Sequence, residues 1–126
     1  MLFKRKIYDK FLAWKTECAG KKALLIEGAR RIGKSTVVEE FAKNEYKSYI
    51  LIDFAKASSD VKEYFQLYLN DLDTFFMLLS VQYGVQLHER DSVIIFDEVQ
   101  LFPKAREAIK YLVADGRYDY METGSL

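Results

Sequence analysis

The most constraining feature of the sequence is the segment at residues 28–35, which matches the pattern G-x-x-x-x-G-K-[ST] in full. It follows a short apolar run at residues 23–26 that predicts a buried strand. It also opens a one-sided apolar pattern at residues 34–43 that predicts a helix. Glycines permit a tight backbone turn lined with N–H groups, and the N-terminus of a helix attracts anions. The segment therefore predicts a loop that holds the phosphates of a nucleotide.

The fixed positions of this phosphate-binding loop (P-loop) have distinct chemical roles. Lys34 supplies a positive charge for the β- and γ-phosphates, and the Ser35 hydroxyl is a ligand for Mg²⁺. We therefore expect ATP and Mg²⁺ as the bound cofactors. Arg30 and Arg31 face either a neighbouring subunit or solvent, and the sequence leaves this choice open. The residues predicted to contact the nucleotide are Gly28, Ala29, Arg30, Arg31, Ile32, Gly33, Lys34, Ser35 and Thr36.

A second chemical signal is the acidic pair Asp97-Glu98, which follows the most apolar run of the chain at residues 92–96. In P-loop proteins the first such carboxylate holds Mg²⁺, often through water, so the predicted metal-binding residues are Ser35 and Asp97. The second carboxylate, Glu98, can act as general base on an attacking water. The pair favours water as the phosphoryl acceptor and predicts ATP hydrolysis.

Two other classes of P-loop protein fit the sequence less well. A GTPase would carry N-K-x-D for guanine recognition and D-x-x-G for its switch, and neither pattern occurs after the P-loop. A small-molecule kinase usually lacks the second carboxylate and needs a basic lid, for which the chain offers no candidate.

Strands and helices alternate along the rest of the chain. Apolar runs at residues 49–52, 92–96 and 118–123 predict three further strands. Helical patterns occupy residues 7–18, 60–84 and 103–116, and Asn70-Asp71 is expected to divide the second of these into two helices. The alternation predicts an α/β fold with a mostly parallel sheet of about four strands. We expect one domain over residues 1–126, with a basic N-terminal helix at residues 1–20 and a core at residues 21–126.

Composition narrows the possible partners and location. Half of the 126 residues are hydrophobic, which is enough for a real core, and 19 basic residues balance 19 acidic ones. This neutrality gives no argument for nucleic acid or an anionic membrane as a partner. No stretch approaches the ~20 apolar residues of a membrane span, and the opening residues lack a signal-peptide core. With Cys18 as its single cysteine, the chain is expected to be soluble and cytoplasmic.

Three motifs in order resemble a known family: GARRIGKST at residues 28–36, IIFDEVQLFP at 94–103 and YDYMETGS at 118–125. The chain resembles the N-terminal part of the ATPase domain of predicted prokaryotic AAA-type ATPases, in the additional-strand, catalytic-glutamate division of P-loop proteins. The resemblance implies a three-layer αβα sandwich. It assigns Lys34 and Ser35 to the nucleotide, Asp97 to magnesium and Glu98 to water activation.

The resemblance also bears on Thr123, and Gln100 is a further position of interest. Thr123 falls where the family's sensor strand places a polar side chain near the γ-phosphate, so we count Thr123 with Lys34 and Glu98 as a predicted catalytic residue. An ordinary strand-end threonine is the alternative. Gln100 either orients a loop or a water, or has a core or surface role.

The chain departs from the family by ending just past the fourth strand. The family's sheet order is 5-1-4-3-2, so a sheet truncated before strand 5 leaves strand 1, at residues 23–27, as an edge. A bare apolar edge is an association hazard. We expect either that the N-terminal helix covers this edge or that two chains associate there.

Three hypotheses about function follow. The first is the ATP-binding module of an AAA-type ATPase, with Mg²⁺-dependent hydrolysis in the complete protein. The second is a nucleotide-binding or structural fragment without turnover, because phosphoryl transfer commonly needs an arginine finger that cannot be assigned here. The third is an ATP-dependent regulator whose specificity lies in a further C-terminal domain.

Overall fold

The computed structural model describes residues 2–28 and 33–125, and within them helices and strands alternate as predicted. The elements in chain order are α1 (Leu2–Cys18), β1 (Leu24–Gly28), α2 (Lys34–Glu45), β2 (Ser48–Asp53), α3 (Ser59–Leu67), α4 (Leu72–Tyr83), β3 (Ser92–Asp97), the 3₁₀ turn η2 (Val99–Leu101), α5 (Pro103–Asp115) and β4 (Asp119–Ser125). The short turn η2 is an addition to the predicted elements, and β4 runs two residues beyond its predicted end.

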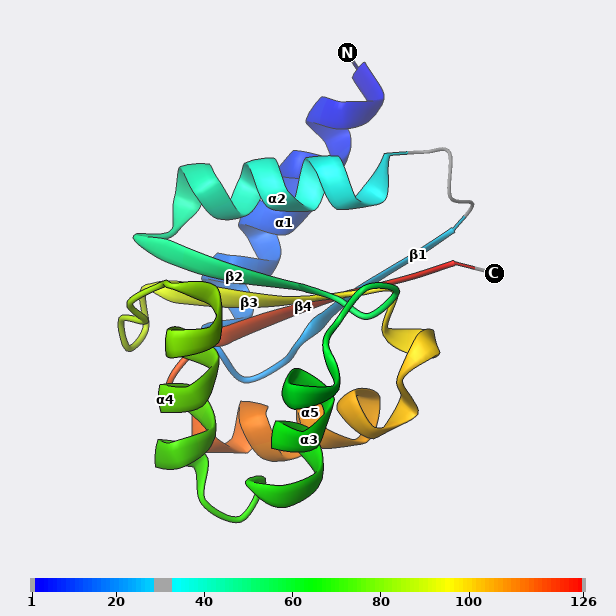
Figure 1. Cartoon of the computed structure of the whole chain (residues 1–126). Coiled ribbons are helices and arrows are strands. Elements are labelled where there is room, and N and C mark those ends of the chain that lie inside the picture. The colour runs from blue at the N-terminus through cyan, green and yellow to red at the C-terminus, as the bar shows by residue number, and fades with distance from the viewer. Residues whose placement is uncertain (1, 29–32, 126) are drawn as a thin grey trace.

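The four strands form one parallel sheet in the order β1-β4-β3-β2. This is the order that the family resemblance implied for strands 1 to 4. In Figure 1 helices α1 and α2 lie on one face of the sheet, and α3, α4 and α5 lie on the other. The predicted three-layer αβα architecture is therefore confirmed.

Each face of the sheet has its own apolar core. On the side of α1 and α2, Phe11, Trp14 and Phe41 pack with Ile95 and Met121 of the central strands. The opposite side is dominated by aromatic rings in edge-to-face contact, with fully buried members Phe65, Phe75, Phe96 and Tyr120. Strand β3 is buried along its whole length because it supplies side chains to both cores. Continuous apolar runs are what a strand covered on both faces requires.

Local signals set several helix ends. Ser58 caps α3 by accepting from the backbone N–H of Val61, and Asp71 caps α4 by accepting from that of Thr74. Asp71 is thus the residue that divides the long helical region, as predicted. Gly84 ends α4 in the left-handed conformation, with φ of 64°, where a residue without Cβ is favoured.

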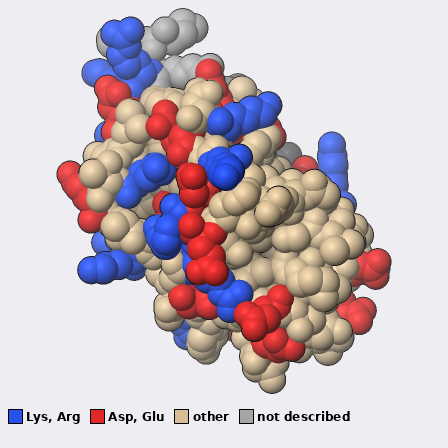
Figure 2. Space-filling view, turned by 90° about the vertical axis from the view of Figure 1, so that its left-hand side faces the viewer, with Lys and Arg blue, Asp and Glu red and all other residues tan. Residues whose placement is uncertain are grey.

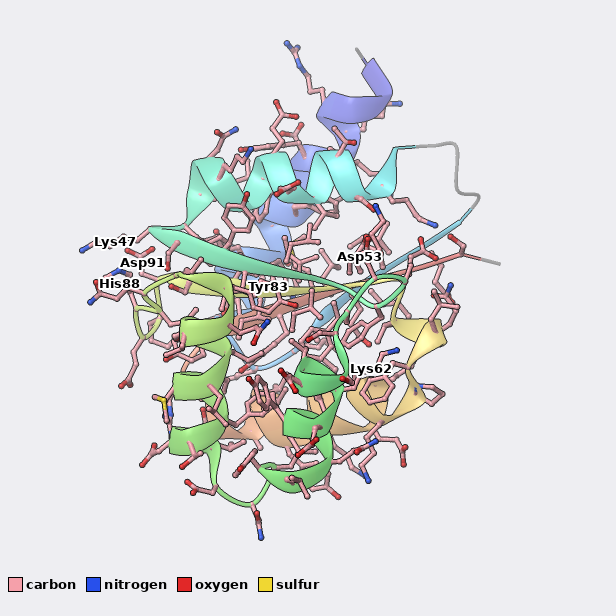
Figure 3. All side chains as sticks on the ribbon, viewed as in Figure 1. Lys47, Asp53, Lys62, Tyr83, His88 and Asp91 are labelled. Carbon is pink, nitrogen blue, oxygen red and sulfur yellow. The ribbon has the colours of Figure 1, made fainter. Side chains whose placement is uncertain are left out.

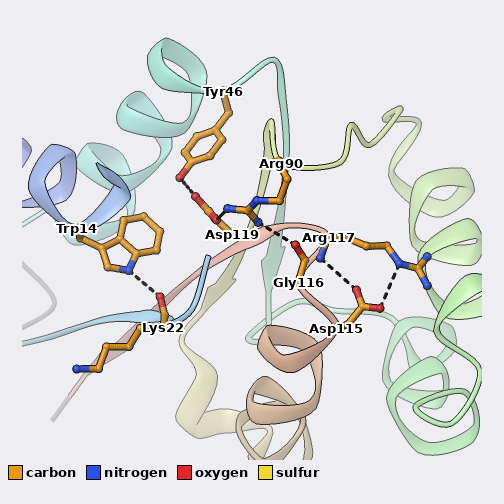
Figure 4. Close-up of polar contacts among 8 residues, drawn as sticks. All are labelled: Trp14, Lys22, Tyr46, Arg90, Asp115, Gly116, Arg117 and Asp119. Atoms are coloured by element: carbon orange, nitrogen blue, oxygen red, sulfur yellow. Dashed lines mark hydrogen bonds and ion pairs between the residues drawn. The ribbon is translucent and has the colours of Figure 1, made fainter. Parts of the chain in front are cut away.

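In the described sheet β1 is an edge strand, since it pairs with β4 alone. Helix α1 is tied to the segment before β1 by a hydrogen bond of 2.8 Å from the Trp14 indole N–H to the carbonyl oxygen of Lys22 (Figure 4). The same helix packs beside α2 through Phe11. Association of two chains at the β1 edge stays a prediction.

Charges of both signs mix on the face shown in Figure 2, where basic and acidic side chains follow one another across the surface. This face lies at the amino ends of the strands, as its position in Figure 1 shows. None of the helices in the described part of the chain has the length and apolar character needed to cross a membrane.

Candidate functional site

The carboxyl ends of three strands and the start of α2 meet at one edge of the sheet. Strand β1 ends at Gly28, β3 at Asp97 and β4 at Ser125, and the register pairs Gly28 with Ser125. Helix α2 begins at Lys34, directly after the loop (Figure 1). In open α/β sheets ligands bind outside the carboxyl ends of the strands. This edge of the sheet is therefore the candidate ligand site.

Lys34 is buried, with 3% of its surface exposed, and its ammonium group is fully engaged. Its Nζ donates to the carbonyl oxygens of Gly28 (2.8 Å) and Gly124 (2.6 Å), and to Ser125 Oγ (3.2 Å). These contacts join the start of α2 to the ends of β1 and β4. A buried charge needs such partners, and the three acceptors match the three N–H donors of an ammonium group.

Asp97 accepts two hydroxyl groups on one carboxylate oxygen. Ser35 Oγ donates to Asp97 Oδ1 at 2.7 Å, and Thr123 Oγ1 donates to the same atom at 2.6 Å. Asp97 is 7% exposed and Thr123 is fully buried. Because Ser35 gives its proton to Asp97, the lone pairs of its oxygen stay available to a cation. Hard oxygen ligands of this kind suit Mg²⁺.

Glu98 lies beside Asp97 in a left-handed backbone conformation, with φ of 56°. Such a conformation is uncommon outside glycine. Its backbone N–H donates to Thr123 Oγ1 at 3.0 Å. Its carboxylate accepts from Gln100 Nε2 at 2.8 Å on Oε1 and from Ser125 Oγ at 2.9 Å on Oε2. The Thr123 hydroxyl therefore contacts both acidic residues: it donates to the side chain of Asp97 and accepts from the backbone N–H of Glu98.

Six of the eight predicted site residues that the structure describes are joined by hydrogen bonds at this edge: Gly28, Lys34, Ser35, Asp97, Glu98 and Thr123. Gly33 lies at the N-terminus of α2 with φ of 69°, and Thr36 is exposed in its first turn. The predicted contacts Ala29, Arg30, Arg31 and Ile32 lie outside the described residues. The catalytic and metal-binding roles of these residues remain predictions.

Ser125 and the carbonyl group of Gly124 belong to the site but were not predicted from the sequence. The role of Gln100 was left open, and its side chain lies against the Glu98 carboxylate. One available signal was the T-G-S ending of the fourth strand. Since parallel strands present their carboxyl ends at one edge, polar residues there were candidates for contact with the P-loop.

Asp53 is a further carboxylate at the same edge, since its register partner across β2 and β3 is Asp97. Its Oδ1 accepts from the backbone N–H of Ala55 at 2.9 Å, which gives it a local turn-forming role. Figure 3 shows Asp53 at this end of the sheet and His88, with Lys47 and Asp91, at the opposite end. His88 therefore belongs to a different region from the candidate site.

A second polar cluster sits at the amino ends of the strands (Figure 4). Asp119 is 4% exposed and accepts from the Tyr46 hydroxyl and from the Arg90 guanidinium, the latter at 2.6 Å. Burial and the adjacent carboxylate raise the pKa of Tyr46 well above its ordinary value. The cluster joins the residue after α2, the segment before β3 and the first residue of β4. It lies at the opposite end of the strands from the P-loop edge.

Comparison with known proteins adds a family and a fold. A family model described as AAA domain matches residues 20–126. No curated protein matches. Among solved structures, one titled as the structure of C. elegans PCH-2 is similar with a TM-score of 0.53 and 12% sequence identity. That match covers 98% of this chain and 36% of the other, and at this identity it shows a shared fold alone.

Proposed function

Because the chain belongs to the AAA domain family, we propose that it binds ATP together with Mg²⁺ at the P-loop and that ATP is hydrolysed at this site. Family membership makes the chain an ATPase-type nucleotide-binding module. The choice of ATP, the need for Mg²⁺ and the hydrolysis are the proposed parts.

The observation that carries the proposal is the convergence of an ammonium, a hydroxyl and two carboxylates at one sheet edge. Lys34 and Ser35 open α2, while Asp97 and Glu98 end β3, and Ser35 contacts Asp97 directly at 2.7 Å. Phosphoryl transfer relies on positioning and on charges placed around the phosphates. This edge supplies a cation for the phosphates, oxygen ligands for a metal and a carboxylate for water.

The residues present fit a magnesium ion. Mg²⁺ is usually held by one or two protein oxygens together with substrate phosphates and waters. Ser35 Oγ and the Asp97 carboxylate would hold it, with the Thr123 hydroxyl fixing the orientation of Asp97. Bound there, the ion would neutralise charge that develops on the phosphates.

Glu98 is the group proposed to activate water. Gln100 donates to one of its carboxylate oxygens and Ser125 to the other. These two donors would hold the orientation of Glu98 while it accepts a proton from water. Lys34 would contact the phosphates, and Thr123 would keep the two acidic residues in register.

One observation favours a second candidate, a nucleotide-binding module without turnover. Lys34 and Glu98 are both engaged with the protein's own groups, at Gly124 and Ser125 in the one case and at Gln100 and Ser125 in the other. A site that keeps Glu98 in these contacts after binding ATP would hydrolyse it slowly or not at all.

The two candidates separate when ATP with Mg²⁺ is titrated by calorimetry and phosphate release is assayed in the same samples. We expect Lys34→Ala to abolish ATP binding, because Lys34 is the buried cation that joins the start of α2 to the ends of β1 and β4. We expect Glu98→Gln to keep the affinity and to remove phosphate release. Release by the wild type supports an ATPase, and binding without release supports the second candidate.

Lys43→Ala is the matched control for the lysine variant, since Lys43 is exposed in the last turn of the same helix. It should bind ATP as the wild type does. Circular dichroism of Lys34→Ala and of Lys34→Met, which keeps more of the side-chain volume, checks that the fold survives loss of the buried ammonium. Tight ATP binding by either folded Lys34 variant would contradict the proposal.

A further inference from the structure

The ammonium group of Lys34 has no N–H left for a phosphate in the described arrangement. Its three donors are matched by Gly28, Gly124 and Ser125 at 2.8, 2.6 and 3.2 Å. A phosphate oxygen can therefore be received only if one of these acceptors is exchanged. A nucleotide that binds at this edge therefore has to displace one of the three acceptors from Lys34.

Ser125 is the acceptor most readily exchanged. Its contact with Lys34 is the longest of the three, and the acceptor is a side-chain hydroxyl. The other two acceptors are carbonyl groups of β1 and β4, which are held in place by the pairing of these strands. Rotation about the Cα–Cβ bond of Ser125 can move its oxygen away from Lys34, whereas a carbonyl moves only with its strand.

Ser125 also contacts Glu98, so its hydroxyl connects the Lys34 ammonium to the Glu98 carboxylate. Its oxygen accepts from Lys34 Nζ while its proton goes to Glu98 Oε2 at 2.9 Å. Hydrogen bonds in a chain polarise one another, so donation by the ammonium strengthens donation by the hydroxyl to the carboxylate. Withdrawal of Lys34 weakens the hold on Glu98.

The other carboxylate oxygen of Glu98 is fixed by Gln100, and the fit at that point is close. A Cβ placed on Gly124 would lie 3.3 Å from Gln100 Oε1, so glycine leaves room for the amide. The same Oε1 is buried and has no hydrogen-bond partner among the described residues. The amide is thus held through its Nε2 contact with Glu98, and this contact does not depend on Lys34.

We infer that Ser125 is a positioning residue that ties Lys34 to Glu98 in the nucleotide-free chain, and that a β- or γ-phosphate replaces Ser125 at the Lys34 ammonium. This inference rests on the proposed function, because it requires a nucleotide at the P-loop. Binding then has a second effect: without donation from Lys34 the hydrogen bond from Ser125 to Glu98 Oε2 weakens, while the contact of Gln100 with Oε1 does not depend on Lys34.

Removal of a side chain from a binding site usually weakens binding, but here we expect the affinity for ATP to increase. Removing the Ser125 hydroxyl removes an acceptor that competes with phosphate for Lys34. We expect Ser125→Ala to bind ATP with Mg²⁺ about three- to tenfold more tightly than the wild type, which corresponds to about 0.7–1.4 kcal/mol. A purely structural role of Ser125 would give weaker binding on substitution.

The test titrates the full chain with ATP, ADP and AMP in the presence of Mg²⁺. The gain of Ser125→Ala should appear for ATP and ADP and be absent for AMP, because only the first two carry the phosphates that Lys34 receives. Ser59→Ala, at an exposed serine in the first turn of α3, should bind as the wild type does. In a second pair of nearly equal volume, Ser125→Val should bind ATP more tightly than Ser125→Thr, which keeps a hydroxyl.

The outcomes separate this inference from the function on which it rests. Unchanged or weaker ATP binding by folded Ser125→Ala and Ser125→Val, with normal binding by the wild type, overturns the inference and leaves the proposed function standing. An equal gain for AMP also overturns it. Absence of ATP binding by the wild type refutes the proposed function, and the inference falls with it.

Discussion

The energetic cost of burying a carboxyl group can be measured at Glu122. The side chain is 7% exposed, and its Oε1 is buried without a hydrogen-bond partner among the described residues. It lines a cavity of about 590 Å³ between α5 and the segment that leads into β1. Burial raises the pKa of Glu122 above 4.5, and the nearby Arg106 lowers it by less. The ionised form is therefore the one that the fold disfavours.

The sign of the pH dependence follows from this shift. With a folded-state pKa above the unfolded value, the native chain binds more protons than the unfolded chain between the two. The contribution of Glu122 to stability is thus intact below about pH 4.5 and is lost as the pH rises through the raised pKa. At neutral pH the carboxylate is a net cost.

We expect Glu122→Gln to increase the free energy of unfolding by about 1 kcal/mol at pH 7. A buried polar group left without a partner costs about 1–3 kcal/mol, and the neutral amide retains part of this cost. For a domain of this size the gain corresponds to roughly 3–5 °C in Tm. Urea unfolding at pH 7 and pH 4 measures it, and the difference between variant and wild type should shrink at pH 4.

Glu107→Gln is the matched control, since Glu107 lines the same cavity from α5 but is exposed. It removes the same charge without relieving burial and should change the stability at pH 7 by much less. A loss of stability in Glu122→Gln, or the same gain at pH 4 as at pH 7, would refute the reasoning.

Two further predictions concern the scaffold around the site. Tyr46→Phe removes a donor to the buried carboxylate of Asp119 and should cost about 1–3 kcal/mol in urea unfolding, whereas Tyr111→Phe, at a ring 56% exposed, should be nearly neutral. Equal effects would contradict the assignment. Gly84→Ala should cost about 1–2 kcal/mol in thermal unfolding, because φ is 64° and no atom lies within 4 Å of the added methyl group. A variant as stable as the wild type would show that the helix end relaxes.

The arrangement of strands and helices could be predicted because its signals are local. Buried parallel strands are continuous apolar runs, and residues 92–96 lie within β3 as observed. Asp71 and Gly84 carry the capping chemistry that bounds α4. The order of strands in the sheet is not a local property, and it came from the family resemblance rather than from periodicity.

The missed part of the site has a physical explanation of the same kind. The apolar pattern of the fourth strand fades at Thr123, but pairing with β1 continues to Ser125. Two more residues in extended conformation bring the Ser125 hydroxyl to Lys34, which lies 91 positions earlier in the chain. The turn after Asp97 was equally hidden, since a left-handed Glu98 has no sequence signal and its amide is satisfied by the distant Thr123.

The position of β4 explains why the contacts most informative about mechanism join distant parts of the sequence. In the described sheet β4 lies between β1, which leads into the P-loop, and β3, which ends in the acidic pair. It is the element through which Lys34 on one side and Glu98 on the other can share a partner, and Ser125 at its end contacts both. Thr123, two residues earlier on the same strand, reaches Asp97 and the Glu98 backbone. Besides the direct contact of Ser35 with Asp97, the end of β4 therefore connects the P-loop lysine to the Glu98 carboxylate, and substitutions there should alter nucleotide affinity more than equally conservative changes at the end of β2.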